Sequence, residues 1–373
     1  MFLKKLMLSD YRSYEYLELA TEGAVNIIVG PNAQGKTNML EAIYVLALSK
    51  SHRTFQDKEL IRWGANSATI SGTIDKKYGV CSLHLTISNQ GKKAKINGLE
   101  QKKMSDFVGS LNVVMFAPED LSIVKGSPSV RRRFLDMEIG QVQPSYLYDC
   151  TQYQKVLLQR NNMLKLMGRE SSQTNDTLLE VWNEQLVRLS IKIMKKRQSF
   201  IHKLQVWAEL IHRGITNGSE SLRIEYKPSF DYDDSLEETV LFEQYMIKLS
   251  QVKQQEIRRN ATLYGPHRDD LAFSINDKDV QTFGSQGQQR TTALSLKLAE
   301  IEFIQEEVGE YPVLLLDDVL SELDTYRQTQ LLETFQTKVQ TFITTTGIES
   351  LQMNRLENAS IFHVRNGKLE KGS

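Results

Sequence analysis

The chain is poor in cysteine: its 373 residues include only Cys81 and Cys150, and no C-x-x-C pair occurs. This scarcity argues against both a disulfide framework and a zinc site, and it favours a reducing compartment. No stretch approaches the roughly 18 apolar residues of a membrane-spanning helix. The opening stretch MFLKKLMLSDYRSY also lacks the apolar core of a signal peptide. We therefore expect a cytoplasmic protein with no membrane partner.

The chain has no excess of charge of either sign, because 46 Lys and Arg balance 46 Asp and Glu. Net charge therefore neither favours nor excludes nucleic acid as a partner, and any basic surface must be local. A hydrophobic fraction of 40% and a charged fraction of 25% are ordinary for a soluble globular protein. The length corresponds to one large domain or two intertwined domains.

Strand patterns occur towards both ends of the chain, and helical patterns occur between them. The predicted strands lie at 25–29, 67–75, 81–88, 111–116, 271–275, 313–316, 341–345 and 361–364. The predicted helices lie at 36–48, 118–139, 144–167, 177–213 and 235–259, and Asn97-Gly98 predicts a hairpin turn. We therefore predict an α/β fold with a mixed sheet core assembled from the N- and C-terminal parts. One lobe comprises residues 1–116 and 285–373, and a mainly helical lobe of residues 117–284 is inserted.

A complete phosphate-binding motif follows the first apolar strand. The stretch Gly30-Pro31-Asn32-Ala33-Gln34-Gly35-Lys36-Thr37 fits G-x-x-x-x-G-K-[ST], and the helix NMLEAIYVL comes directly after it. The glycines let backbone N–H groups surround an oxyanion at the helix N-terminus. Lys36 is expected to reach the β- and γ-phosphates of ATP, and Thr37 to hold Mg²⁺. A chance glycine loop is the alternative, and the flanking strand and helix argue against it.

Two acidic residues follow the apolar stretch VLLL at 313–316. Ligands of open α/β sheets lie at the carboxyl ends of the strands, where Asp317 and Asp318 are placed. We predict that Asp317 holds Mg²⁺ and that Asp318 orients or deprotonates the attacking water. Asp318 and Lys36 are the two predicted catalytic residues. The alternative is that the pair only caps a helix that begins near Ser321.

The stretch GSQGQQRTTALSLKLAE, at 284–300, places a polar turn before an apolar helix. Ser285 alone is a good helix cap, and this simple reading stays open. Beside a P-loop and an acid pair, however, Ser285, Gly287 and Gln288 resemble the signature turn of ABC-type ATPases. In that superfamily the signature serine and glycine contact the γ-phosphate held by a partner subunit.

Several longer blocks carry a closer resemblance. They are SDYRSYEYLEL, PEDLSIVKGSPSVRRRFLD, YGPHRDDL, SQGQQR and LLLDDVLSELD. With the P-loop, they resemble the RecF family of bacterial recombination-repair proteins, which is related to the SMC and Rad50 ATPase heads. The matching blocks span residue 1 to about 346. The resemblance implies an ABC-type P-loop ATPase head without a long coiled coil.

The resemblance also implies the activity and the partners. It implies a weak, DNA-stimulated ATPase that dimerises around Mg²⁺-bound ATP and binds single-stranded or gapped DNA without sequence preference. It further implies association with the RecR and RecO mediators, indirect action on RecA, and roles in replication and in the SOS response.

Further site residues follow from the analogy with SMC-like heads. Arg12 is expected to approach the phosphates, the loop from Ser321 to Asp324 to cross the dimer interface, and Thr344 to Thr346 to form the switch. The chain departs from the superfamily in having Asp318 in place of a glutamate, threonines in place of a switch histidine, and no evident Q-loop glutamine. We therefore hypothesise slow hydrolysis, with ATP acting as a dimerisation switch.

Basic clusters are the candidates for DNA contacts. The favoured ones are Arg131, Arg132, Arg133, Lys195, Lys196 and Arg197; Lys92-Lys93-x-Lys95 and Arg258-Arg259 are others. Such clusters bind phosphates without base readout. The alternatives are solvated faces, or, for the arginine triplet, a brace between the lobes. His267-Arg268-Asp269-Asp270 is explained nearly as well by a turn with internal salt bridges.

Two other functions fit the sequence less well. An ATP-driving subunit of a transporter normally carries a Q-loop glutamine and a switch histidine, and neither is evident here. An SMC or Rad50-type linker protein needs long heptad arms. Only about a hundred helical residues are inserted here.

Overall fold

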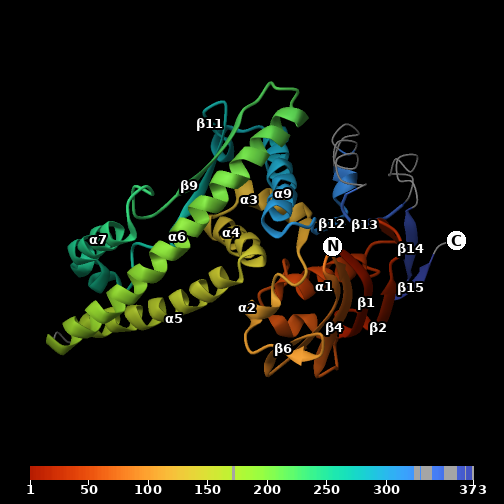
Figure 1. The fold of residues 1–373 in the computed structure, drawn as a ribbon, viewed down its shortest axis with the longest axis horizontal. Helices are drawn as coiled ribbons and strands as arrows, with labels where there is room; N and C mark the ends of the chain where they lie inside the picture. Colours follow the sequence, from red (N-terminus) through yellow and green to blue (C-terminus); the bar gives the residue numbers. More distant parts are fainter. Residues whose placement is uncertain (170–172, 323–327, 329–337, 348–358, 366, 372–373) are drawn as a thin grey trace.

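The computed structural model describes residues 1–373 except 170–172, 323–327, 329–337, 348–358, 366 and 372–373. A strand-rich part and a helical part lie side by side along the long axis (Figure 1). The strand-rich part contains two six-stranded sheets.

A mainly parallel sheet draws its strands from both ends of the chain. Its order is β15 (Lys368–Lys371), β14 (Ser360–Arg365), β3 (Val25–Val29), β13 (Thr341–Thr345), β12 (Val313–Asp317) and β8 (Val113–Phe116). Only the β14–β15 pair is antiparallel. β3, β8, β12 and β13 are buried throughout, because both faces of the sheet are covered, so they are continuous apolar runs. The prediction of a sheet assembled from both ends is confirmed.

The second sheet is antiparallel and has one solvated face. Its order is β2 (Tyr14–Ala20), β1 (Phe2–Tyr11), β4 (Ser67–Lys76), β5 (Gly79–Ser88), β6 (Gly91–Ile96) and β7 (Leu99–Glu100). Burial alternates along β4, as expected for a half-buried strand. Asn97 and Gly98 join β6 to β7 with φ values of 50° and 80°, which confirms the predicted turn. The apolar helix α1 (Lys36–Leu48) shares one core with both sheets.

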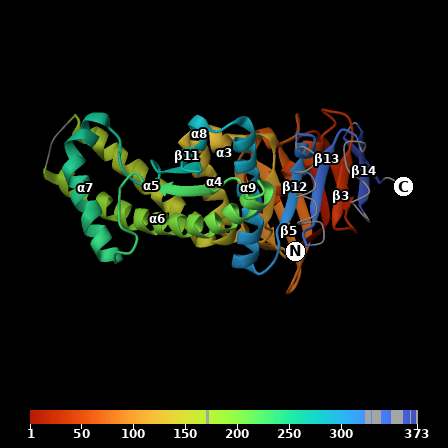
Figure 2. The same cartoon turned by 90° about the horizontal axis from the view of Figure 1, so that it is seen from above.

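The helical part follows β8. Its elements are η2 (Pro118–Asp120), α3 (Leu121–Lys125), α4 (Pro128–Val142), α5 (Pro144–Met167), α6 (Gln173–Ile215), α7 (Glu238–Arg259), α8 (Val280–Phe283) and α9 (Gln286–Val308). A small antiparallel sheet of β9 (Leu222–Lys227), β10 (Asp270–Ile275) and β11 (Lys278–Asp279) lies beside α6 (Figure 2). β9 was not predicted. Within the described residues, the other short helices are η1 (Asp57–Leu60), α2 (Met104–Phe107) and η3 (Val319–Glu322).

The helical part and the parallel sheet share a hydrophobic core. This core combines one face of β3, β8, β12 and β13 with side chains of α4, α5, α6 and α9. α9 packs against α6 and also against β8, so it bridges the two predicted lobes. In the part of the chain that the structure describes, no helix is long and apolar enough to cross a membrane.

Candidate nucleotide-binding site

Four strands of the parallel sheet end at the same edge. β3 leads into the stretch 30–37, β12 ends at Asp317, β13 leads to Thr346, and β8 leads to Ala117. The carboxyl ends of parallel strands meet at one edge, and ligands of α/β sheets bind there. The fold therefore brings together motifs that lie up to about 300 residues apart in the sequence.

The P-loop presents backbone N–H groups at the start of α1. Gly35 is the N-cap, with a φ of 107° that disfavours other residues, and it has no side chain to cap the helix. The first N–H groups of α1 are therefore available to an anion. Gly30 is packed so closely that a Cβ there would lie 2.5 Å from the Val364 carbonyl oxygen. Both glycines are thus required by geometry.

The side chain of Lys36 folds back over this loop. Its Nζ donates to the carbonyl oxygens of Gly30 at 2.6 Å and Pro31 at 2.9 Å. Burial lowers the pKa of Lys36, and the charges of Asp318 and Asp317 oppose this shift. The ammonium group is therefore held at the mouth of the loop by two neutral carbonyl oxygens.

Asp317 and Thr37 meet as the sequence predicted for a shared metal. The Thr37 hydroxyl donates to Asp317 Oδ1 at 3.0 Å, and the Thr344 hydroxyl donates to the same oxygen at 2.8 Å. Burial raises the pKa of Asp317, and among the described residues this carboxylate has no ion-pair partner. A buried carboxylate beside a hydroxyl is a suitable oxygen set for Mg²⁺, which binds proteins through one or two such groups plus substrate phosphates.

Asp318 occupies an unusual backbone conformation. Its φ is 55°, in the left-handed region that aspartate tolerates better than most residues. Its N–H donates to Thr344 Oγ1 at 3.0 Å. Thr344 therefore contacts both acidic residues, while Thr346 lies exposed beyond the end of β13. The left-handed backbone gives a physical reason for a short acid at 318.

Arg12 is held by a residue that the sequence did not single out. Its Nε and Nη2 donate to the two carboxylate oxygens of Glu41 at 2.8 and 2.7 Å. Ser51 also donates to Glu41, at 2.5 Å. Glu41 is the one acidic residue in the mainly apolar helix α1, and this position was the signal in the sequence that could have marked it as the partner of a buried polar group. The approach of Arg12 to phosphates stays a prediction.

The predicted signature turn lies exposed at the start of α9. Ser285 Oγ accepts from the Gln288 N–H at 3.2 Å, and Gln288 Oε1 accepts from the Ser285 N–H at 2.9 Å. This reciprocal capping confirms the simple reading of Ser285. A Cβ added at Gly287 would meet only Ser285 Oγ, at 3.8 Å. The chain's own packing therefore gives no reason for a glycine at 287.

The dimer-loop prediction falls only partly within the described residues. Ser321 belongs to η3, which follows β12 and Asp318. Asp324 lies outside the described residues.

The structure corrects the DNA prediction for two arginines. Arg131 and Arg197 are each only 3% exposed, so a DNA phosphate cannot reach them. Arg131 forms an ion pair with Asp270 at 2.6 Å, and Arg197 forms one with Asp136 at 2.9 Å.

The other basic residues of the clusters 131–133 and 195–197 also contact groups of the chain itself. Arg132 donates to the Asp269 carbonyl at 2.8 Å, and Lys196 pairs with Asp149 at 3.1 Å. Lys195 lies 4.0 Å from Glu238. Arg133, on α4, donates to the Ser51 carbonyl, which lies just after α1. This last contact is the lobe brace that was the alternative reading.

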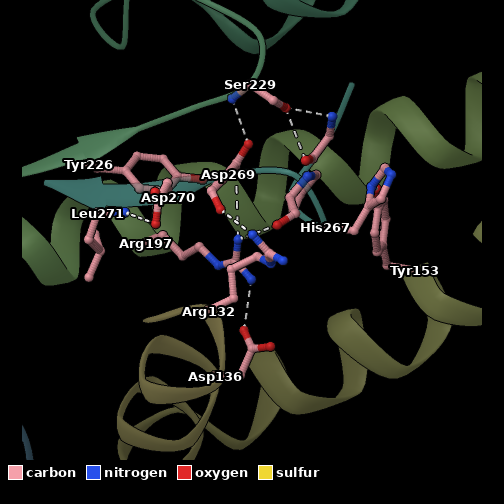
Figure 3. A network of polar contacts seen from close by, with 12 residues as sticks. Arg132, Asp136, Tyr153, Arg197, Tyr226, Ser229, His267, Asp269, Asp270 and Leu271 are labelled. Atoms are coloured by element: carbon pink, nitrogen blue, oxygen red, sulfur yellow. Dashed lines mark hydrogen bonds and ion pairs between the residues drawn. The ribbon is translucent and has the colours of Figure 1, made fainter. Parts of the chain in front are cut away.

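The stretch 267–270 belongs to a polar network at the centre of the helical part (Figure 3). Arg197 lies 3.6 Å from Asp269, whose carboxylate also accepts from the Tyr226 hydroxyl and the Ser229 N–H. His267 accepts from the Tyr153 hydroxyl at 2.6 Å, and burial lowers its pKa to about 4. The stretch forms the expected turn, but its salt bridges are not internal: Asp269 pairs with Arg197 of α6, and Asp270 pairs with Arg131 of α4.

Known proteins resemble this chain along its whole length. The family model for the "RecF/RecN/SMC N terminal domain" matches residues 2–370. The DNA replication and repair protein RecF of Bacillus mycoides (strain KBAB4) is 58% identical over 370 residues, which cover 99% of this chain and 98% of the relative. The RecF of Bacillus cereus (strain AH820) matches with the same identity and coverage.

Solved structures resemble the fold as well. The recombination mediator protein RecF-ATPrS in the RecFOR pathway has a TM-score of 0.92 and 34% identity, covering 100% of this chain and 98% of that one. The Smc head domain derived from Pyrococcus furiosus has a TM-score of 0.56 at 15% identity, covering 100% and 96%. These matches confirm the predicted ABC-type ATPase head with an inserted helical region and no long coiled coil.

Proposed function

Since the chain belongs to the RecF family of DNA replication and repair proteins, we propose that it is a slow, DNA-stimulated ATPase of recombinational repair. ATP and Mg²⁺ are its cofactors. The observation that carries this proposal is the meeting of Thr37, Asp317 and Thr344 beside Lys36 at the carboxyl edge of the parallel sheet. A transporter subunit is not favoured by these relatives.

Each residue of the site has a distinct part in binding ATP. The N–H groups of residues 30–37 surround the phosphates, and Lys36 exchanges its two carbonyl acceptors for phosphate oxygens. Thr37 and Asp317 hold the metal, which when bound neutralises charge on the β- and γ-phosphates. Asp318 orients the attacking water. Because its side chain is one methylene shorter than glutamate, the water geometry is less favourable and turnover is slow.

The signature turn acts on the nucleotide of a second subunit. Ser285 and Gly287 are exposed on the chain's own surface. Open space at Gly287 suits the close approach of a phosphate or backbone from a partner. We therefore expect two copies to enclose two ATP molecules between the P-loop of one subunit and the signature turn of the other.

Mixing two inactive variants tests this shared site. Lys36→Met removes the phosphate contact, and Ser285→Arg blocks the signature turn, so each protein alone is expected to lack turnover. A random equal mixture forms one half heterodimers, each with one intact site of two, so about a quarter of wild-type turnover is expected. Steady-state ATPase assays of the variants and the mixture measure this. If the mixture stays as inactive as its components, active sites are not shared between subunits.

DNA is the proposed macromolecular ligand, bound in its single-stranded or gapped form and without sequence preference. The RecR and RecO mediators are proposed partners, RecA an indirect one, and support of the SOS response a proposed role. Of the basic clusters, Lys93 and Lys95 are exposed on β6, next to each other on the solvated face of the antiparallel sheet. Arg258 and Arg259 are exposed as well, but as successive residues of α7 they point about 100° apart and do not share one face. Lys92 is instead bound to Asp57 at 2.6 Å. Lys93 and Lys95 are therefore the preferred phosphate contacts.

The salt dependence of binding tests this surface. For Lys93→Ala/Lys95→Ala, the slope of log K against log[salt] on a gapped duplex is expected to fall by about 1.8, since each lost phosphate contact contributes about 0.9. Fluorescence anisotropy with and without Mg-ATP measures both the slope and the nucleotide effect. Lys227→Ala is the control, because Glu225 already neutralises Lys227 at 2.9 Å. An unchanged slope excludes these two lysines, and DNA binding that does not depend on ATP excludes a role of the nucleotide in controlling DNA binding.

A further inference from the structure

A continuous chain of buried polar side chains runs from β8 to α9 through α4. At its first end, the Gln141 amide imitates a neighbouring strand. Gln141 Oε1 accepts from the Val113 N–H at 3.0 Å, and Gln141 Nε2 donates to the Val113 carbonyl at 3.1 Å. Since β8 is an edge strand of the parallel sheet, this amide fixes α4 to the sheet in one register.

The chain continues through two carboxylates and a lysine. Gln141 Nε2 donates to Glu138 Oε2 at 2.6 Å, and the other Glu138 oxygen lies 3.6 Å from Lys297 Nζ on α9. Lys297 donates to Glu300 at 2.5 Å. All four side chains are at least nine-tenths buried. α9 is therefore attached to β8 by directional contacts and not only by apolar packing.

Stability alone does not account for this arrangement. Burial raises the pKa of Glu300 well above its usual range and that of Asp120, which lies close to Lys297, to about 6. Desolvation of this kind largely offsets the attraction within a buried ion pair, so apolar side chains of similar size give equal or greater stability. Apolar side chains tolerate repacking, so they allow α9 to shift along α4 and β8, whereas paired charges hold the helix in one position.

The two elements that the polar chain joins each lead to one half of the nucleotide site, although Val113 itself pairs with Val313, four residues before Asp317. β8 is the neighbour of β12, whose last residue is Asp317. α9 begins at the turn of Ser285, about 18 Å along the helix from Lys297. In a two-fold dimer that closes two sites at once, the spacing between these halves within one subunit decides whether both sites fit.

We propose that Lys297 is a positioning residue that, through Glu138 and Gln141, sets the placement of the signature turn relative to the P-loop of the same subunit. This inference rests on the proposed ATP sandwich. Lys297 itself contacts no nucleotide in this arrangement, so its effect appears in dimer closure and not in the first binding of ATP.

Neutral replacement of the ion pair tests the proposal. Lys297→Met/Glu300→Met keeps the volume and leaves no unpaired lysine or glutamate on α9; Glu138 loses its positive partner but keeps the hydrogen bond from Gln141. ATP affinity of the dilute monomer, measured with a fluorescent ATP analogue, is expected to stay unchanged. The dimer dissociation constant with a non-hydrolysable ATP analogue, measured by analytical ultracentrifugation, is expected to rise about tenfold or more. Lys203→Met is the matched control, because Lys203 pairs with Glu307 of α9 at the exposed surface.

A second variant separates positioning from folding. Gln141→Met cuts the polar chain at Val113 but leaves the Lys297–Glu300 pair intact, and the same loss of dimerisation is expected. Lys297→Arg, which keeps the charge, is expected to dimerise nearly as wild type does. Wild-type dimerisation of Lys297→Met/Glu300→Met or of Gln141→Met, in a variant that is folded, overturns the proposal for Lys297. If the wild-type protein itself fails to dimerise with the ATP analogue, the sandwich is at fault instead, so the two failures are distinguishable.

Discussion

Replacing Asp317 with asparagine is expected to reduce ATP turnover by about 10²–10³-fold and, at the same time, to make the nucleotide-free protein more stable. In the wild type, the hydroxyl groups of Thr37 and Thr344 donate to Asp317 Oδ1, and in the variant they can donate to the asparagine oxygen instead. Only the negative charge is lost, and with it the attraction for Mg²⁺. Burial raises the pKa of Asp317, so the ionised form is less favourable in the folded chain than in the unfolded one. The Asp317→Asn variant does not carry this buried charge, so its free energy of unfolding at neutral pH is expected to be larger than that of the wild type.

Thermal unfolding with and without Mg-ATP, together with an ATPase assay, measures both effects. Wild-type protein is expected to gain stability from Mg-ATP, whereas Asp317→Asn gains little. The pH dependence has a definite sign: without metal, wild-type stability falls as pH rises through the unfolded and then the raised folded pKa of Asp317. Asp75→Asn, at a surface pair with Lys4, serves as the control. A variant that is both inactive and less stable means that Asp317 is mainly structural.

Replacing Arg197 with methionine is expected to destabilise the protein by about 3–5 kcal/mol, because the fully buried carboxylate of Asp269, 3.6 Å away, is left without a positive partner. Arg197 donates to Asp136 at 2.9 Å, to the Tyr146 hydroxyl at 2.9 Å and to the Pro266 carbonyl at 2.7 Å. Methionine fills the volume but makes none of these bonds. Equilibrium unfolding in urea, followed by circular dichroism, measures the change in the free energy of unfolding.

The adjacent Lys196 provides the comparison. Its pair with Asp149 is part-exposed, so Lys196→Met is expected to cost less than about 1 kcal/mol. If Arg197→Met is as stable as the wild type but binds DNA more weakly, Arg197 does not stabilise the buried network, and it is again a candidate for a DNA contact.

Local patterns predicted the strand and helix of the candidate nucleotide site well, because these elements are contiguous in sequence. The strand 25–29, the P-loop and the helix 36–48 follow one another, and the structure has these strand and helix bounds. Asp317 was equally visible, because a buried strand ends at it. The fold class followed from strand patterns at both ends of the chain.

The basic clusters failed for a geometric reason. Successive residues of an α-helix point about 100° apart, so three adjacent basic residues do not share one face. On α6, the side chains of Lys195 and Lys196 reach the surface, whereas that of the next residue, Arg197, points into the interior. A count of charges in sequence does not record this difference.

Partners distant in sequence could not be predicted either. Glu41 meets Arg12 only because β1 and α1 pack in one core, and Gln141 meets Val113 only because α4 crosses the edge of β8. No pattern in either segment points to the other. Such pairings are set by tertiary structure, which composition and periodicity do not encode.

The order of strands in the parallel sheet also has a consequence during synthesis. β3 carries the P-loop, yet its two neighbours in the sheet, β13 and β14, begin at residues 341 and 360. At translation rates of about 5–20 residues per second, β3 waits roughly 15–60 s for its first neighbour to be made. During that time the backbone N–H and C=O groups of β3 have no strand partners, and the glycine loop has no support from β14. A ribosome-bound chain therefore acquires its ATP site only when nearly all of it has been translated, and late-stage truncations remove the site at the opposite end of the sequence.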